Sequence, residues 1–230
     1  MKYMGSKARH SRAIIAAMSV RPNEVYVEPF VGGANLIADI PATDRRAADV
    51  DEDLICLWQA VSAGWTPPEQ FTEDEYRAIR AAPVSPLRGY AAFALSYGGK
   101  KFGGWRRDKQ GVRNYVAEAR RNALAQFPKL RGVRFDLGSY ESLDIPDRAV
   151  VYCDPPYAAT TGYASGGFDS GGFWDWARKL SARCRVFVSE YTAPADFMPV
   201  WQTTVANSLT QNTGASRAVE KLWVIAPEWD

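Results

Sequence analysis

Hydrophobic residues recur along the chain with two different periods. Short apolar and β-branched runs predict buried strands at 25–27, 47–50, 133–136, 150–153, 185–189 and 219–225. Apolar residues at helical spacing lie between them and predict helices at 35–40, 51–63, 72–82, 86–95, 114–126 and 173–182. Another helix is expected after residues 2–7, with Ser6 as N-cap and Ile14, Ile15 and Met18 on its apolar face. This alternation predicts an α/β fold that ends in a hairpin.

The strand–helix alternation stops between about 65 and 127, where only helical patterns occur. We therefore expect one α/β domain built from 1–64 and 128–230, interrupted by a segment called here the insert, 65–127. A chain of 230 residues with 47% apolar residues can bury a large core, and it shows no internal repeat.

Composition narrows the possible chemistry. Cys56, Cys153 and Cys184 are scattered without metal-ligand spacing, which favours a reducing compartment and no zinc site. His10 is the only histidine, which disfavours histidine-dependent triads and histidine-rich metal sites. Neither a membrane-spanning segment nor a signal peptide is expected, so we predict a cytoplasmic protein. An enzyme of this composition would take its reactivity from a cofactor.

The strand at 150–153 runs directly into Asp154, Pro155, Pro156 and Tyr157. Proline cannot continue a strand, so Asp154 should lie at the carboxyl end of a central strand, where α/β sheets bind ligands. The Asp154 carboxylate and the Pro155 carbonyl are two neighbouring acceptors for an amino group conjugated to a ring, and Tyr157 offers an aromatic face. A tight turn that merely closes the strand explains the same residues.

The strand at 25–27 runs into Glu28-Pro29-Phe30-Val31-Gly32-Gly33. A strand followed by a glycine turn and a helix is typical of cofactor loops. The turn lacks GxGxxG, which disfavours a dinucleotide. It contains an acid and no basic residue, which suits a cationic ligand such as S-adenosylmethionine. Asp49 ends the next strand at about the spacing of a ribose-binding carboxylate, Tyr140 is placed to flank an adenine, and Lys7 is available to a carboxylate.

Basic residues are concentrated in the insert and at the N-terminus. Between 98 and 134 eleven lysines and arginines face two acids, Asp108 and Glu118. This predicts a surface that binds a polyanion, although a solvated helix surface fits as well. The segment 97–107 interleaves glycines, basic residues and aromatics, so we expect a hairpin that contacts phosphates, with Phe102 and Trp105 stacking or wedging at bases. The alternative is a flexible surface hairpin.

Four motifs occur in a fixed order: KYMGSK at 2–7, YVEPFVGG at 26–33, AADV at 47–50 and YCDPPY at 152–157. In this order, with a basic helical insert between the third and the fourth, the chain resembles the Dam-type (D12 class) adenine-specific DNA methyltransferases along essentially its whole length. The resemblance implies a Rossmann-like S-adenosylmethionine-dependent methyltransferase sheet with a helical and hairpin DNA-recognition insert. It implies double-stranded DNA as partner, no metal, and a monomer or weak dimer.

The resemblance also assigns roles to individual residues. Those that would bind S-adenosylmethionine are Tyr3, Lys7, Glu28, Phe30, Gly32, Gly33, Asp49, Tyr140 and Asp154. Those of the catalytic loop are Asp154, Pro155, Pro156 and Tyr157. Lys2 matches a position that can touch DNA, and the basic cluster adds the expected DNA contacts Lys100, Lys101, Arg106, Arg107 and Arg113.

The predicted reaction moves a methyl group from S-adenosylmethionine to the 6-amino group of adenine in DNA, after the base has flipped out of the duplex. The same chemistry on the 4-amino group of cytosine, on a base in RNA or on a protein glutamine is an alternative. A different alternative is a DNA-binding module that has lost catalysis, or that binds the cofactor for stability. An oxidoreductase would need the phosphate fingerprint that is missing here.

Overall fold

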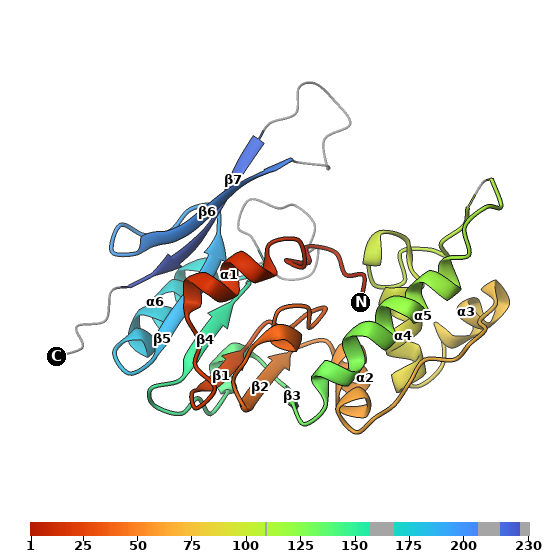
Figure 1. Cartoon of the computed structure of the whole chain (residues 1–230), viewed down its shortest axis with the longest axis horizontal. Helices are drawn as coiled ribbons and strands as arrows, with labels where there is room; N and C mark the ends of the chain where they lie inside the picture. The colour runs from red at the N-terminus through yellow and green to blue at the C-terminus, as the bar shows by residue number, and fades with distance from the viewer. Residues whose placement is uncertain (109, 157–167, 207–216, 226–230) are drawn as a thin grey trace.

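A computed structural model describes residues 1–108, 110–156, 168–206 and 217–225. They form a seven-stranded sheet with the order β3-β2-β1-β4-β5-β7-β6 (Figure 1). The strands are β1 (Val25–Glu28), β2 (Asp44–Asp49), β3 (Arg134–Leu137), β4 (Val150–Cys153), β5 (Arg185–Glu190), β6 (Met198–Ala206) and β7 (Arg217–Val224). The first five are parallel, and β7 runs antiparallel between β5 and β6.

The strand order reverses between β1 and β4, which pair side by side. Such a reversal creates a crevice at the carboxyl ends of the strands, where open α/β sheets bind their ligands. The predicted Rossmann-like sheet and its closing hairpin are therefore confirmed. The hairpin also distinguishes this sheet from the dinucleotide-binding order, in which a sixth strand simply follows the fifth.

The two faces of the sheet follow the alternation of side chains along each strand. Tyr26, Tyr152 and Leu222 are buried on the face covered by helices α1 (Ser11–Met18) and α2 (Glu52–Ser62). The residues next to them in sequence, among them Val27 and Val151, are buried on the opposite face with side chains of α6 (Ser170–Ser181). The central strands of the sheet thus lie between two apolar layers.

Three helices lie beside the sheet in Figure 1: α3 (Glu73–Ile79), α4 (Pro86–Ala94) and α5 (Tyr115–Gln126). Caps begin them: Thr72 and Glu75 form a reciprocal capping box at α3, and Ser85 caps α4 ahead of Pro86. Side chains of α2, α4 and α5 belong to one apolar cluster, so these helices pack onto the sheet domain. The boundaries of the insert at 65 and 127 stay a prediction.

Two predicted helices differ from the structure. The first begins at Ser11 with His10 as its N-cap, while the Ser6 hydroxyl accepts hydrogen bonds from the Ala8 amide and from Asn35 Nδ2. The segment 35–40 forms only a 3₁₀ turn, η1 (Ile37–Asp39), because Ile40 is extended before a proline. Within the described part of the chain, no helix is long and apolar enough to span a bilayer.

Candidate active site

The glycine turn after β1 is held by hydrogen bonds to side chains of three elements. The Gly32 amide donates to Asp49 Oδ2 at 2.9 Å, and Trp58 Nε1 donates to the Gly32 carbonyl at 2.9 Å. Gln126 Nε2 donates to the Gly33 carbonyl, also at 2.9 Å. Strand β2, helix α2 and helix α5 therefore fix the turn together. Trp58 and Gln126 were not predicted as site residues, because their sequence positions are ordinary core and helix-end positions.

Tyr3 lies directly on the glycine pair. A Cβ atom at Gly32 would come within 2.6 Å of the Tyr3 ring, and one at Gly33 within 2.6 Å of the Tyr3 Cβ. Gly32 also has φ of +45°, which disfavours other residues. The Tyr3 ring lies 5.5 Å from that of Phe93 in α4. The turn therefore requires glycine, because the N-terminal segment packs against it. Tyr3 lies beside the glycine turn, and its predicted contact with the cofactor stays a prediction.

Asp49 accepts hydrogen bonds with both carboxylate oxygens, one from the glycine turn and one from the start of α2. Beside the bond from Gly32, its Oδ1 accepts from the Asp51 amide at 3.0 Å. Burial raises the pKa of Asp49, although these backbone bonds counteract the effect. The predicted ribose contact of Asp49 stays a prediction.

Glu28 ends β1 as a deeply buried carboxyl group, with 3% of its surface exposed. Among the described residues its Oε2 has no hydrogen-bond partner. Burial raises the pKa of Glu28 well above the usual value, and the nearby charge of Asp154 raises it further. A buried polar atom without a partner is costly in the folded protein, so this oxygen suits a ligand that brings a donor or a positive charge.

Asp154 follows β4 and pairs with a lysine from the N-terminal segment. Lys7 Nζ lies 2.9 Å from Asp154 Oδ1 and 3.5 Å from Glu220 Oε1, and it donates to the Gly5 carbonyl at 3.3 Å. Burial lowers the pKa of Lys7, but the two carboxylates outweigh it and the net shift is upward. Lys7 is therefore a cation wedged between two carboxylates. We call Glu28, Asp154 and Glu220, with Lys7, the carboxylate cluster.

The remaining residues of the predicted catalytic loop are only partly described. Pro155 is buried and Pro156 half-buried after Asp154. Tyr157 lies outside the described residues. The strand beneath the loop is rigidly packed, because Cys153 is fully buried and the Tyr152 hydroxyl lies 2.8 Å from that of Ser189.

Phe30 and Tyr140 lie in an aromatic group on the α6 face. Their ring centroids are 5.3 Å apart, and Tyr140 also lies 4.9 Å from Trp176 and 5.6 Å from Phe173. Only 8% of Tyr140 is exposed. The Tyr140 ring is thus largely enclosed by other rings, and its predicted contact with the cofactor's adenine stays a prediction.

The family model of D12 class N6 adenine-specific DNA methyltransferases matches residues 3–83. The predicted resemblance is confirmed over these residues. The match covers Tyr3, Lys7, Glu28, the glycine turn and Asp49, and it ends before Asp154. It supports a methyltransferase that uses S-adenosylmethionine.

Comparison with known proteins also finds distant structural likenesses. TrmN from Thermus thermophilus is 15% identical over 95% of this chain and 49% of its own, with a TM-score of 0.44. An rRNA methylase from Streptococcus thermophilus is 10% identical over 98% and 99%, with a TM-score of 0.43. SMU.1697c from Streptococcus mutans, solved in complex with SAH, is 10% identical over 96% and 99%, with a TM-score of 0.38. This chain spans about half the length of TrmN. No curated protein matches the sequence.

Three of the six basic residues predicted to bind DNA are held by acids, namely Lys101, Arg106 and Arg107. Arg106 is 9% exposed, pairs with Glu118 at 2.9 Å and lies over the Tyr115 ring. Lys101 Nζ lies 2.9 Å from Asp51, the N-cap of α2, and 2.9 Å from Asp53 in the first turn of that helix. The prediction for Arg106 needs correction, because its guanidinium packs inside the insert and is not presented to a partner.

The remaining predicted contacts, like Arg107, are exposed. Arg107 pairs with Glu73 of α3. No ion pair is recorded, within the described ranges, for Lys2, Lys100 or Arg113. These three side chains remain available to a phosphate.

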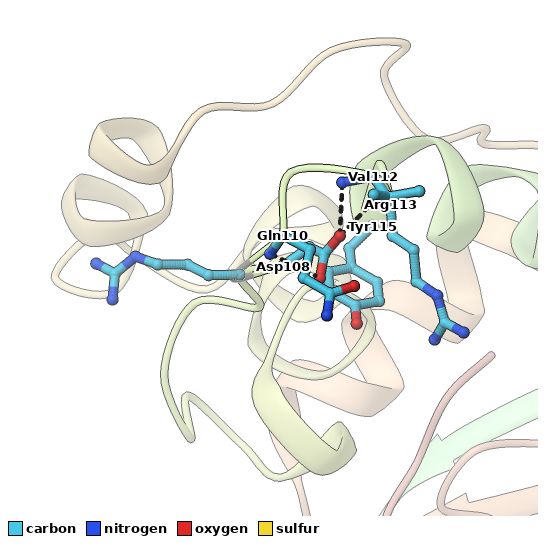
Figure 2. A pocket seen from close by; sticks show the side chains of 6 residues that line it. Asp108, Gln110, Val112, Arg113 and Tyr115 are labelled. Atoms are coloured by element: carbon cyan, nitrogen blue, oxygen red, sulfur yellow. Dashed lines mark hydrogen bonds between the residues drawn. The ribbon is translucent and has the colours of Figure 1, made fainter.

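A turn organised by Asp108 presents Arg113. Figure 2 shows the Asp108 carboxylate turned into the loop, where it accepts from the amides of Val112 at 2.8 Å and Arg113 at 2.7 Å. The bond from Arg113 is the main cause that lowers the pKa of Asp108. Gln110 and Tyr115 line the shallow hollow beside this turn. Asp108 therefore shapes the loop, and its charge also interacts with that of Arg113.

Phe102 and Trp105 are not exposed wedges, which corrects a second prediction. Both are half-buried and pack on Tyr76 of α3, with ring centroids 5.8 Å and 5.4 Å away. Trp105 also forms an isolated antiparallel bridge with Ser96. The aromatics at 97–107 thus serve mainly to fasten the loop onto the insert.

Proposed function

We propose that this protein transfers a methyl group from S-adenosylmethionine to the 6-amino group of adenine in double-stranded DNA. The observation that carries the proposal is the position of Asp154. It follows β4 at the point where the strand order reverses, paired with Lys7 and next to Glu28. Lys7 and Glu28 belong to the segment that matches D12 class adenine-specific DNA methyltransferases.

The residues around the glycine turn fit the proposed cofactor. The unpartnered Glu28 oxygen suits the α-ammonium group, and the Asp49 carboxylate has lone pairs left for hydroxyls beyond its two backbone bonds. Gly32 and Gly33 keep the backbone free of side chains at the same edge. When bound, S-adenosylmethionine would supply an electrophilic methyl group on a sulfonium.

The target amine is assigned to Asp154 and the Pro155 carbonyl. Both are acceptors on a stiff loop, so together they can receive the two N–H groups of an exocyclic amine and orient its lone pair. The base has to leave the duplex stack to reach them. Tyr157 stays assigned to stacking on that base through the resemblance alone.

DNA binding is assigned to the exposed cations of the insert and the N-terminus, chiefly Lys2, Lys100 and Arg113. Exposed lysines and arginines without an acidic partner bind phosphates and release counterions from the duplex. With Arg106 removed from this set, the insert contributes fewer phosphate contacts than its composition suggests. Residues 65–127 are accordingly proposed as the target-recognition part.

The test incubates the protein with tritiated S-adenosylmethionine and either duplex DNA or RNA of mixed sequence, followed by mass spectrometry of the nucleosides. We expect N6-methyladenine from DNA. Methylated cytosine, or label in RNA alone, would replace the substrate in the proposal. Cofactor binding by calorimetry without any transfer would favour the catalytically silent DNA-binding module.

A further inference from the structure

Glu220 lies in the last described strand, far in sequence from the motifs of the active site. Strand β7 runs antiparallel beside β5, with Lys221 opposite Glu190, so the start of β7 lies near the carboxyl end of β5. Leu222 is buried on the α1 face, and Glu220, two residues earlier, points to the same face. Only 5% of Glu220 is exposed. The hairpin thus brings a buried carboxylate to the edge that carries Asp154.

Lys7 connects Glu220 to Asp154. Its ammonium is surrounded by the Asp154 carboxylate, the Glu220 carboxylate and the Gly5 carbonyl. An ammonium carries three N–H donors, so each of these acceptors can receive one. A lysine side chain is long and flexible. Several acceptors that bind its ammonium together hold it at one position.

We propose that Glu220 is a positioning residue for methyl transfer, acting on Asp154 through Lys7. The inference rests on the function proposed above. Lys7 and Asp154 alone would form a neutral pair, in which the positive charge of the lysine balances the negative charge of Asp154. With Glu220 the three groups carry a net negative charge, so Asp154 stays a strong acceptor for the target amine.

The charge balance predicts a pH effect. Among the described residues, the titratable groups that face Lys7 include Asp154 after β4, Glu220 from β7 and Tyr191 just after β5. Burial lowers the pKa of Lys7, and both carboxylates raise it. Removing the Glu220 charge takes away one of the raising effects, so Lys7 should lose its proton at lower pH. A neutral Lys7 no longer holds Asp154 in place by an ion pair, so the alkaline limb of the kcat profile should move to lower pH.

The first experiment compares Glu220→Gln with the wild type on duplex DNA. We expect kcat to fall about tenfold, the scale for losing one hydrogen bond to a charged group. The Kd for S-adenosylmethionine should stay within about twofold, and the alkaline limb should shift down. Glu220→Asp should recover part of kcat. The matched control is Glu52→Gln, an exposed residue of α2 with the same change of charge, which should leave kcat and the profile unchanged.

A double-mutant cycle with Lys7→Met tests the route. If Glu220 acts through Lys7, Glu220→Gln should have no further effect in the Lys7→Met background. Wild-type protein that makes no N6-methyladenine would sink the proposed function itself. Active wild type with unchanged kcat and pH profile in Glu220→Gln would overturn only this inference. A melting curve checks folding, and if Glu220→Gln does not fold, the kcat criterion alone is applied to Glu220→Asp, which keeps the charge.

Discussion

The carboxylate cluster and the insert both carry many charges, but they hold them in opposite ways. In the cluster, Lys7, Asp154 and Glu220 are largely buried and satisfy one another at the sheet edge. In the insert, pairs such as Arg107 with Glu73 lie on the surface. Removing one partner of a buried pair costs several kcal/mol, whereas most surface pairs contribute little. Charge therefore fixes geometry in the first region, and in the second it stays largely on the surface.

The insert also shows that charges close in sequence are a poor guide to charge on a surface. Asp51 and Asp53 neutralise Lys101, and Glu73 neutralises Arg107, although all three acids lie well before the basic block. The surface proposed to bind a polyanion is thus smaller than the composition predicts. Substitutions in the two regions should therefore differ both in the property that they change and in the size of the change.

The largest effect should come from Asp154→Ala. We expect methyl transfer to fall on the order of 10³-fold, as for the loss of a group aimed at the reacting atoms. Cofactor affinity should largely survive, because Glu28, Asp49 and the glycine turn remain. Tritium transfer and calorimetry measure the two quantities separately. Asp154→Asn, which keeps the shape, should also lose most activity, and full activity in either variant would contradict the assignment of Asp154.

The next effect concerns Arg106, where the structure corrects the sequence prediction. Arg106→Met should lower the free energy of unfolding by about 2 kcal/mol, because it breaks a mostly buried pair with Glu118 and a contact over Tyr115. Urea denaturation measures the change. The matched variant Arg113→Met, at an exposed site, should leave stability unchanged. Equal stability of both variants would mean that Arg106 is not part of the packing.

The elements that could be predicted from the sequence are those with local signals. The strands ending at Glu28 and Cys153 are short apolar runs that stop at an acid, and the strand ending at Asp49 shows such a run only in its second half. Parallel strands align their carboxyl ends. That pattern is sufficient to bring Asp154 near the glycine turn. The helix at 35–40 was wrong because Ile40 precedes a proline, and the cap at Ser6 was wrong because Asn35 competes for its hydroxyl.

What the sequence could not supply are contacts made by residues far apart in the chain. Glu220 is 213 positions from Lys7, and Gln126 reaches Gly33 over 93 positions. The one available signal for Glu220 was its place two residues before Leu222 on the buried face of a strand. Phe102 and Trp105 gave no signal that Tyr76 would cover them. Local sequence patterns predict helices and strands, but the packing of helices against one another decides which side chains an aromatic residue contacts.

A smaller effect should follow from Glu28→Gln. The pKa of Glu28 is raised in the folded protein, so above the unfolded value of about 4.3 the unfolded chain loses a proton that the folded chain keeps. Wild-type stability therefore falls as pH rises from there toward the folded pKa. The glutamine variant lacks this loss, and we expect its Tm to exceed the wild-type value by about 2–4 °C at pH 8 and by less at pH 4. Cofactor affinity should weaken, because the amide carries no negative charge to form an ion pair with the ammonium of the cofactor.

The smallest effects should distinguish Arg113 from Arg107 on the surface of the insert. Arg113 has no recorded acidic partner in the described residues, so Arg113→Ala should reduce the slope of log K against log salt for DNA binding by about 0.9, one phosphate contact. Arg107→Ala should change the slope less, since Glu73 already holds that guanidinium. Glu73→Gln releases Arg107 and should strengthen binding at low salt. Filter binding at several salt concentrations measures all three, and identical slopes for the two arginine variants would show that the pairing with Glu73 does not persist on DNA.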